Sequence, residues 1–144
     1  MIEVLPKQTS MAYVKGFKYQ LHEEISFIIP ELAPYAPIVL DYIEVREGGE
    51  LVLKKGLASD GASGPTYDTP SSMRGAFVHD ALYKLMRLGL IPRSFRQKAD
   101  RIITILCKMD GMYGWRAESW YKFLRWFGHK AVQASSRRKI RYAP

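Results

Sequence analysis

The sequence has little cysteine and no long hydrophobic run, which excludes a fold held together by internal disulfides and a protein with a membrane-spanning helix. Cys107 is the single cysteine among 144 residues, so no disulfide can form within the chain. This content fits folding in a reducing compartment. No window approaches the roughly 18 consecutive apolar residues of a membrane-spanning helix, and the first ten residues lack the apolar core of a signal peptide. We therefore expect synthesis in the cytoplasm without a signal peptide.

Signatures of sequence-specific nucleic-acid binding are also missing, although the formal net charge is +8. The chain has no zinc-finger spacing, no helix-turn-helix signature and no basic helix with a base-reading face. Four basic residues lie within the last eight positions, Arg137, Arg138, Lys139 and Arg141. The charge is either ordinary solvated surface charge or a means of attracting an anionic partner. Sequence-specific binding of nucleic acid is not expected.

The composition that is present suits one folded domain. Hydrophobic residues make up 47% and charged residues 25% of the chain, which is a globular profile. We predict a single α+β domain over residues 1–134, followed by a basic tail over 135–144. Within the domain, a small antiparallel sheet is expected over about 11–55, a loop over 56–72 and helices over about 72–134.

The sheet and helices are predicted from residue patterns. Strand-like runs occupy 11–20, 24–29, 38–46 and 51–55. Gly48 and Gly49 separate the last two runs, which predicts a β-hairpin. A helical hairpin should follow, with one helix from Ser71 or Ser72 to about Leu88 and a second from about Pro92 or Ser94 to Asp110. The third, aromatic-rich helix is predicted from about Trp115 to Ala134.

The helical hairpin predicts a histidine–aspartate pair. His79 lies about as far before the turn at Gly89 as Asp100 lies after it, so the two stand at the same height on facing helices. Tyr83 is one turn from His79 and shares its face. A carboxylate opposite an imidazole can fix its tautomer for general-base catalysis. The same pair is also a common buried hydrogen bond, so a purely structural role stays open.

A cation site is predicted beside this pair. Asp80 points about 100° away from His79 around the helix and can bind a cation there. Calcium requires several oxygen ligands. The upstream loop can provide them through Asp60, Gly61 and Ser63, with glycines that permit close approach.

The aromatic helix and the tail are the candidate partner-binding regions. Trp120 and Trp126 lie among basic residues in the third helix, and Arg137 and Arg138 lie in the tail. Such a helix can pack in the core, contact another protein or lie on a membrane surface.

The motifs resemble those of a bacteriophage and prophage family named domain of unknown function 1353. The resemblance covers about residues 50–130 and rests on three segments: GLASDGASGP at 56–65, AFVHDALY at 76–83, and Ala99-Asp100. It implies a phage or prophage origin, so we expect synthesis in a host bacterium, with incorporation into the virion as one possible destination. It implies no particular activity.

A more distant resemblance concerns chemistry. His79-Asp80-x-x-Tyr83 followed by Asp100 is similar to the pattern of phospholipase A2. Carried over, His79 activates a water, Asp100 orients His79, Tyr83 braces the pair and Asp80 binds calcium. The chain departs from that pattern by lacking the flanking disulfide cysteines and the glycine-rich calcium loop.

Two functions follow as hypotheses. The first is a calcium-assisted ester hydrolase that acts on a lipid of the host envelope. The second is a structural or assembly accessory protein of the virion, in the tail or head, whose partners are other phage proteins and in which the motif is structural. A weaker third hypothesis is an intracellular phage protein that binds a host factor.

Overall fold

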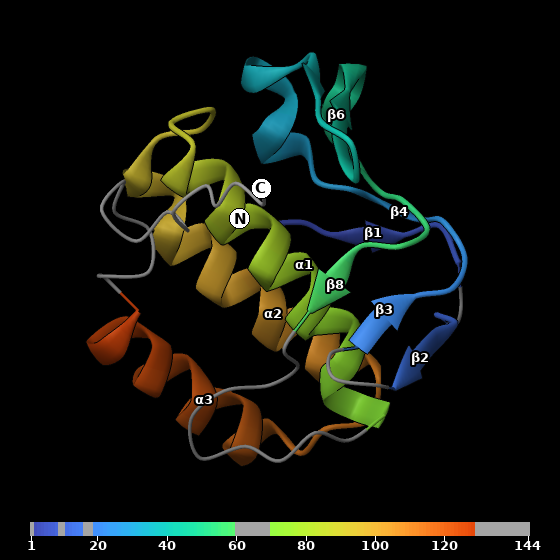
Figure 1. The fold of residues 1–144 in the computed structure, drawn as a ribbon. Helices are drawn as coiled ribbons and strands as arrows, with labels where there is room; N and C mark the ends of the chain where they lie inside the picture. Colours follow the sequence, from blue (N-terminus) through green and yellow to red (C-terminus); the bar gives the residue numbers. More distant parts are fainter. Residues whose placement is uncertain (1, 9–10, 16–18, 60–69, 129–144) are drawn as a thin grey trace, which may run out of the picture.

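Short antiparallel strands precede three helices, which confirms the predicted α+β class (Figure 1). The computed structural model describes residues 2–8, 11–15, 19–59 and 70–128. The strands form two sheets rather than one. Their bounds are β1 (Leu5–Pro6), β2 (Tyr13–Lys15), β3 (Tyr19–Leu21), β4 (Ile25–Ile28), β5 (Ile38–Val39), β6 (Ile43–Arg46), β7 (Glu50–Leu53) and β8 (Ala58–Ser59).

The larger sheet has five strands in the order β1–β4–β7–β6–β5. Its β6–β7 hairpin confirms the predicted hairpin, with Val45 opposite Leu51. Alternate residues of β6 are buried, so one face of the hairpin belongs to the core. The turn is the short 3-10 segment η2 (Glu47–Gly49), in which both glycines have positive φ. A Cβ on Gly49 would lie 2.1 Å from the carbonyl oxygen of Ile29, so this turn requires glycine.

The smaller sheet has the order β2–β3–β8. Its third strand, β8, lies inside the segment 56–72 that was predicted to be loop, so this part of the prediction is wrong. Leu57 is buried beside β8, and the Leu21 amide donates to the Leu57 carbonyl at 2.9 Å. Pairing with β3 therefore extends the sheet beyond the last run of β-branched residues.

Within residues 70–128, three α-helices follow the strands: α1 (Pro70–Arg87), α2 (Arg96–Met109) and α3 (Gly114–Phe127). Gly89 and Gly111 have positive φ two residues after the ends of α1 and α2, as the predicted helix ends require. A 3-10 turn, η3 (Arg93–Phe95), leads into α2, and another, η1 (Pro30–Tyr35), follows β4. The third helix was predicted to extend to 134, and residues 129–134 lie outside the described part.

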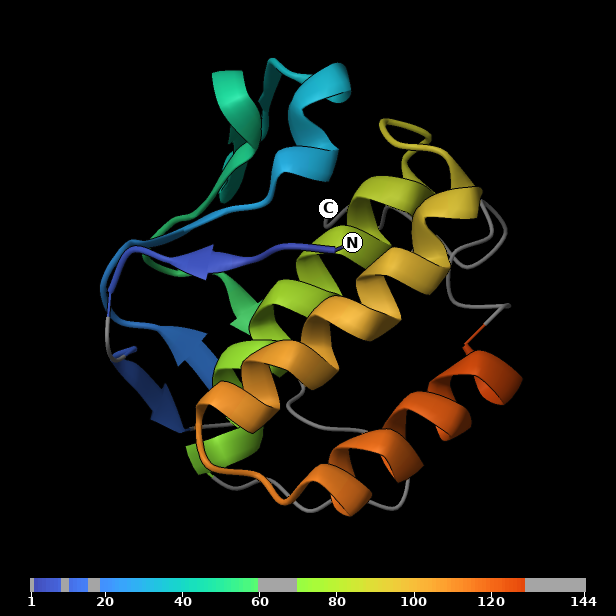
Figure 2. The ribbon, with the colours of Figure 1, turned by 180° about the vertical axis from the view of Figure 1, so that it is seen from behind.

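The α1–α2 hairpin lies between the sheets and α3 (Figures 1 and 2). One side of the hairpin packs on the strands in a core that includes Phe27, Leu53 and Phe77. The other side forms a smaller cluster with α3 around Trp120. Among the described residues, no helix is both long and apolar enough to cross a bilayer.

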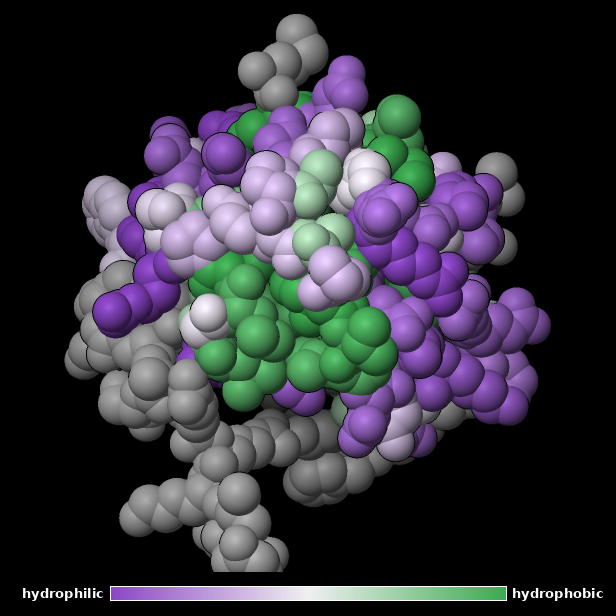
Figure 3. Space-filling model, turned by 90° about the horizontal axis from the view of Figure 1, so that it is seen from above, coloured by the Kyte–Doolittle hydropathy of each residue, from purple (hydrophilic) through white to green (hydrophobic). Residues whose placement is uncertain are grey.

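Apolar side chains also reach the surface at the end of the molecule that is uppermost in Figure 1. Figure 3 looks down on this end and shows apolar residues gathered at its centre with hydrophilic residues around them. Among the described residues, Val39 of β5 and Leu88 and Leu90, which follow α1, are exposed apolar residues.

Candidate active site

Helix α1 presents His79 and Tyr83 together. They are four residues apart, and their rings lie 4.0 Å apart between centroids. Both residues are buried, His79 at 6% and Tyr83 at 4% exposure. Helical spacing alone therefore places an imidazole and a phenol side by side within the protein.

Asp100 of α2 completes the predicted pair. It is fully buried, and its Oδ1 lies 2.9 Å from His79 Nε2. The Tyr83 hydroxyl donates to the same oxygen. Because an ionised carboxylate can only accept, His79 donates its Nε2 proton to Asp100. The predicted pairing of His79 with Asp100, and the participation of Tyr83, are confirmed.

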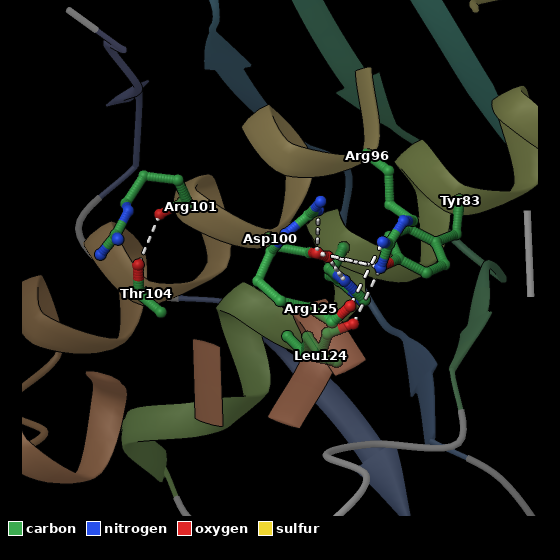
Figure 4. Close-up of polar contacts among 8 residues, drawn as sticks. Tyr83, Arg96, Asp100, Arg101, Thr104, Leu124 and Arg125 are labelled. Carbon is green, nitrogen blue, oxygen red and sulfur yellow. Dashed lines mark hydrogen bonds and ion pairs between the residues drawn. The ribbon is translucent and has the colours of Figure 1, made fainter. Parts of the chain in front are cut away.

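Two arginines occupy the second oxygen of Asp100, and sequence reasoning missed both (Figure 4). Arg125 of α3 donates from Nη1 to Oδ2 at 3.0 Å. Arg96, one turn before Asp100 in α2, has its Nη1 3.6 Å from the same oxygen. The buried carboxylate thus has cations on one oxygen and uncharged or titratable donors on the other. Such pairing is what makes a buried charge tolerable.

Arg96 also joins the end of α3 to this network (Figure 4). Its Nη1 donates to the Leu124 carbonyl at 2.9 Å and its Nη2 to the Arg125 carbonyl at 3.3 Å. Both carbonyls belong to the last helical turn, and that of Leu124 also accepts a hydrogen bond from the Gly128 amide at 2.9 Å. Gly128 follows closely, and a Cβ there would come within 2.6 Å of the Tyr83 hydroxyl. Three helices therefore meet at Asp100.

Tyr83 keeps its proton in this environment. Burial raises its pKa well above the ordinary tyrosine value, and the neighbouring charge of Asp100 raises it further. Tyr83 is therefore a hydrogen-bond donor to Asp100 and not a general base at neutral pH.

The arrangement can support general-base chemistry at His79. With Nε2–H donated to Asp100, the lone pair of the neutral imidazole is on Nδ1. No hydrogen bond between described residues occupies Nδ1. Asp100 can stabilise the imidazolium that forms when Nδ1 takes a proton. The side chain of His79 is 8% exposed, so only an edge of it is open to solvent.

The described residues fit only part of a calcium site. Asp80 is partly exposed on α1, and its Oδ2 accepts a hydrogen bond from Ser59 Oγ of β8 at 2.6 Å. Ser59 was not among the predicted site residues. Within the described ranges, no group of three or more acidic, histidine or cysteine side chains is placed to hold a metal ion. One carboxylate is insufficient for calcium, which takes six to eight oxygens.

Several predicted residues cannot be compared with the structure. Asp60, Gly61 and Ser63, predicted to bind the metal, lie outside the described residues, as do Arg137 and Arg138. The two tryptophans that were predicted to bind a partner differ in exposure. Trp120 is 1% exposed and packs with Leu124 in the cluster between α3 and the hairpin, whereas Trp126 is 75% exposed. Trp120 therefore belongs to the core and not to a partner surface, because it is on the helix face that meets α2.

A sequence signal existed for one of the two missed arginines. Arg96 precedes Asp100 by four residues, the spacing at which an arginine and an aspartate meet on a helix. Arg125 is 25 residues away in another helix and has no comparable local signal. Comparison of the chain with protein-family models, curated protein sequences and solved structures finds no match.

Proposed function

We propose that this protein is a phage-derived ester hydrolase in which His79 is the general base. The supporting observation is the buried hydrogen bond between His79 Nε2 and Asp100 Oδ1, with Tyr83 on the same oxygen. The phage origin rests on the resemblance of residues 56–65, 76–83 and 99–100. We include synthesis in the host cytoplasm and incorporation into the virion in the same proposal.

The proposed reaction needs one water and one ester. His79 Nδ1 takes a proton from the water, and the resulting hydroxide attacks the ester carbonyl carbon. Asp100 holds the ring through Nε2–H and stabilises the imidazolium charge. When the carbon–oxygen bond to the leaving group breaks, the imidazolium returns its proton to the departing alkoxide. A carboxylic acid and an alcohol are the products.

Calcium is the proposed cofactor, with Asp80 as its ligand from α1 and Asp60, Gly61 and Ser63 as ligands from the upstream segment. Bound there, calcium would polarise the ester carbonyl. A calcium titration of the purified protein tests this part separately. Wild type should bind calcium and Asp80→Asn should bind it more weakly; equal binding, or none, would remove calcium from the proposal.

The decisive test is substitution of His79 with alanine. Release of fatty acid from phospholipid micelles, and hydrolysis of a short-chain nitrophenyl ester, should fall about a hundredfold or more, because general-base catalysis contributes at least that much. His22→Ala is the matched control, since His22 is exposed in the first half of the chain. Urea unfolding confirms that both variants fold. Wild type without ester hydrolysis, or His79→Ala with the wild-type rate, contradicts the proposal.

A second candidate is a structural or assembly accessory protein of the virion. It is favoured by the junction of three helices at Asp100, because two arginines on one carboxylate stabilise a packing arrangement whether or not any reaction occurs. Mass spectrometry of purified particles should then detect the protein in stoichiometric amounts, together with its phage partners. If the protein is a hydrolase without a structural role in the virion, particles should assemble normally with His79→Ala.

A further inference from the structure

Helix α3 exposes two of its three tryptophans. Trp115 is 71% exposed and Trp126 is 75% exposed, although tryptophan is a side chain that proteins mostly bury. Trp120 lies between them in sequence and is in the core. Figures 1 and 2 show α3 on the outer side of the α1–α2 hairpin.

The exposed tryptophans share one face of the helix. Eleven residues separate them, which is close to three full turns, and about 16 Å along the axis. Ser119 and Lys122 are exposed between them at the intervening helical positions. We call these four residues, Trp115, Ser119, Lys122 and Trp126, the α3 stripe. The Ser119 hydroxyl donates to the Trp115 carbonyl at 2.8 Å, so the stripe offers two indoles and one ammonium group to a partner.

This pattern suits a lipid surface better than a protein interface. The centre of a protein interface is depleted of charged residues and closely packed, whereas a serine and a lysine separate these indoles. Indoles with nearby lysine and arginine are the usual anchors at the boundary between lipid headgroups and acyl chains. We propose that the α3 stripe is a docking surface for a lipid bilayer with anionic headgroups.

The charge around the stripe selects anionic lipid. Lys122 is on the stripe and Arg116 is elsewhere on α3, whereas the charge of Arg125 is paired with Asp100. Glu118 is the acidic residue of the helix, and it already pairs with Arg101 at 2.8 Å and Lys108 at 2.9 Å. The net charge of +8 adds a longer-range attraction to anionic headgroups.

The stripe is also close in sequence to the candidate active site. Arg125 precedes Trp126 and contacts Asp100 directly. Docking through α3 would therefore place the His79–Asp100 pair near a bilayer, which contains ester lipids. This consequence rests on the proposed hydrolase function, whereas the docking itself does not.

Vesicle binding by the full chain tests the docking surface. We expect wild type to sediment with vesicles of phosphatidylcholine and phosphatidylglycerol in equal parts, with a blue shift of tryptophan emission, and to bind pure phosphatidylcholine vesicles weakly. The double variant Trp115→Ala/Trp126→Ala should lower the partition coefficient by about tenfold or more, because the two indoles supply most of the apolar area. Val39→Ala, 72% exposed on β5, is the apolar control and should bind like wild type.

A pair of charge reversals separates the stripe from the overall charge. Lys122→Glu and Lys84→Glu both change exposed lysines and both lower the net charge by two, from +8 to +6. Lys84 is on α1, away from the stripe. Binding to the anionic vesicles should fall about tenfold for Lys122→Glu and much less for Lys84→Glu.

Three outcomes overturn the proposal. They are no binding of wild type to anionic vesicles, equal binding by the double tryptophan variant, and equal loss in the two charge reversals. If wild type ignores vesicles but forms dimers that the double variant lacks, the stripe is a protein interface and the lipid assignment is wrong. His79→Ala should bind vesicles like wild type, so failure of docking and failure of hydrolysis are observed separately.

Discussion

Asp100 in α2 and Asp110 just after α2 each join helices through ion pairs with arginine, but the partners of their two carboxylate oxygens differ. Both carboxylate oxygens of Asp110 accept hydrogen bonds from one arginine. Arg74 Nε donates to Oδ2 at 3.1 Å, and Arg74 Nη2 donates to Oδ1 at 2.6 Å. Arg74 also donates to the Gln8 carbonyl at 2.8 Å. This is a two-pronged ion pair between a guanidinium and a carboxylate, without an imidazole.

Asp100 divides its oxygens between two kinds of partner. Oδ2 is near the arginines Arg96 and Arg125, while Oδ1 accepts from His79 and Tyr83. The cations offset the buried charge and leave the other oxygen to an imidazole. An arginine partner is common to both aspartates, so it does not by itself mark a reactive site. The distinguishing feature is the oxygen of Asp100 that is shared with a titratable ring.

Removing the charge of Asp100 should have the largest effect. Asp100→Asn leaves Arg96 and Arg125 without their counter-charge and should lower the free energy of unfolding by about 3–5 kcal/mol. Urea unfolding followed by tryptophan fluorescence measures the change. Asp41→Asn, at an exposed position, should be neutral. A loss as small as that of the control would mean that Asp100 is no more important to stability than a surface carboxylate.

Removing Arg74 should cost less and should separate stability from activity. Arg74→Met should lower the free energy of unfolding by about 2 kcal/mol, because Asp110 is 17% exposed and water can solvate it. Under the proposed hydrolase function, the rate of ester hydrolysis per folded molecule should stay at the wild-type value. A rate loss equal to that of His79→Ala would erase the distinction between the two aspartates.

Removing the Tyr83 hydroxyl should cost about 1 kcal/mol, the net value of one hydrogen bond. The effect should depend on pH. Because burial raises the pKa of Tyr83 in the folded protein, its contribution is fully present below the ordinary tyrosine pKa and is lost as pH rises above it. Wild type should therefore lose stability more steeply than Tyr83→Phe in alkaline urea titrations.

Cys107 must be separated from this measurement. Burial raises the pKa of its thiol to about 12, so it too loses a stabilising contribution in alkaline solution. That loss is common to wild type and Tyr83→Phe and cancels in their difference. Parallel curves for the two proteins would show that Tyr83 does not titrate differently on unfolding.

The exposed carboxylate Glu118 should show the smallest effect. It pairs with Arg101 and Lys108 but its side chain is 41% exposed, so solvent screens the attraction. Glu118→Gln should change the free energy of unfolding by no more than about 0.5 kcal/mol. Thermal unfolding at low and high salt measures this. A loss as large as that of Arg74→Met would show that exposure does not rank these ion pairs.

The sequence predicted the parts of the site that depend on local geometry. Equal spacing about Gly89 predicted that His79 and Asp100 would meet, and helical periodicity predicted the place of Tyr83. Arg125 could not be predicted, because its approach depends on how α3 packs on the hairpin. The same limit applies to Trp120 and Trp126, which look alike in sequence and differ only in the helix face they occupy.

The fold shows the same division. The β6–β7 hairpin is local and was predicted from its glycine turn. Strand β8 was missed because two residues carry no periodic pattern, and their strand geometry comes from pairing with β3. The division of the strands into two sheets likewise depends on long-range pairing, which no local run of residues encodes.

Gly75 has a consequence for which substitutions the chain can accept over evolutionary time. It lies in α1 four residues before His79, where a Cβ would approach Ile103 Cγ1 to 3.0 Å and Cys107 Sγ to 3.1 Å. Glycine within a helix costs about 1 kcal/mol relative to alanine, so drift toward alanine would be favoured if the neighbouring helix were further away. At these distances Ile103 and Cys107 would have to shift by a few tenths of an ångström to admit a Cβ, so the close crossing opposes that drift. The close crossing also constrains the rotation of α1 one turn before His79. Gly75, which has no side chain, therefore helps to orient the imidazole of His79.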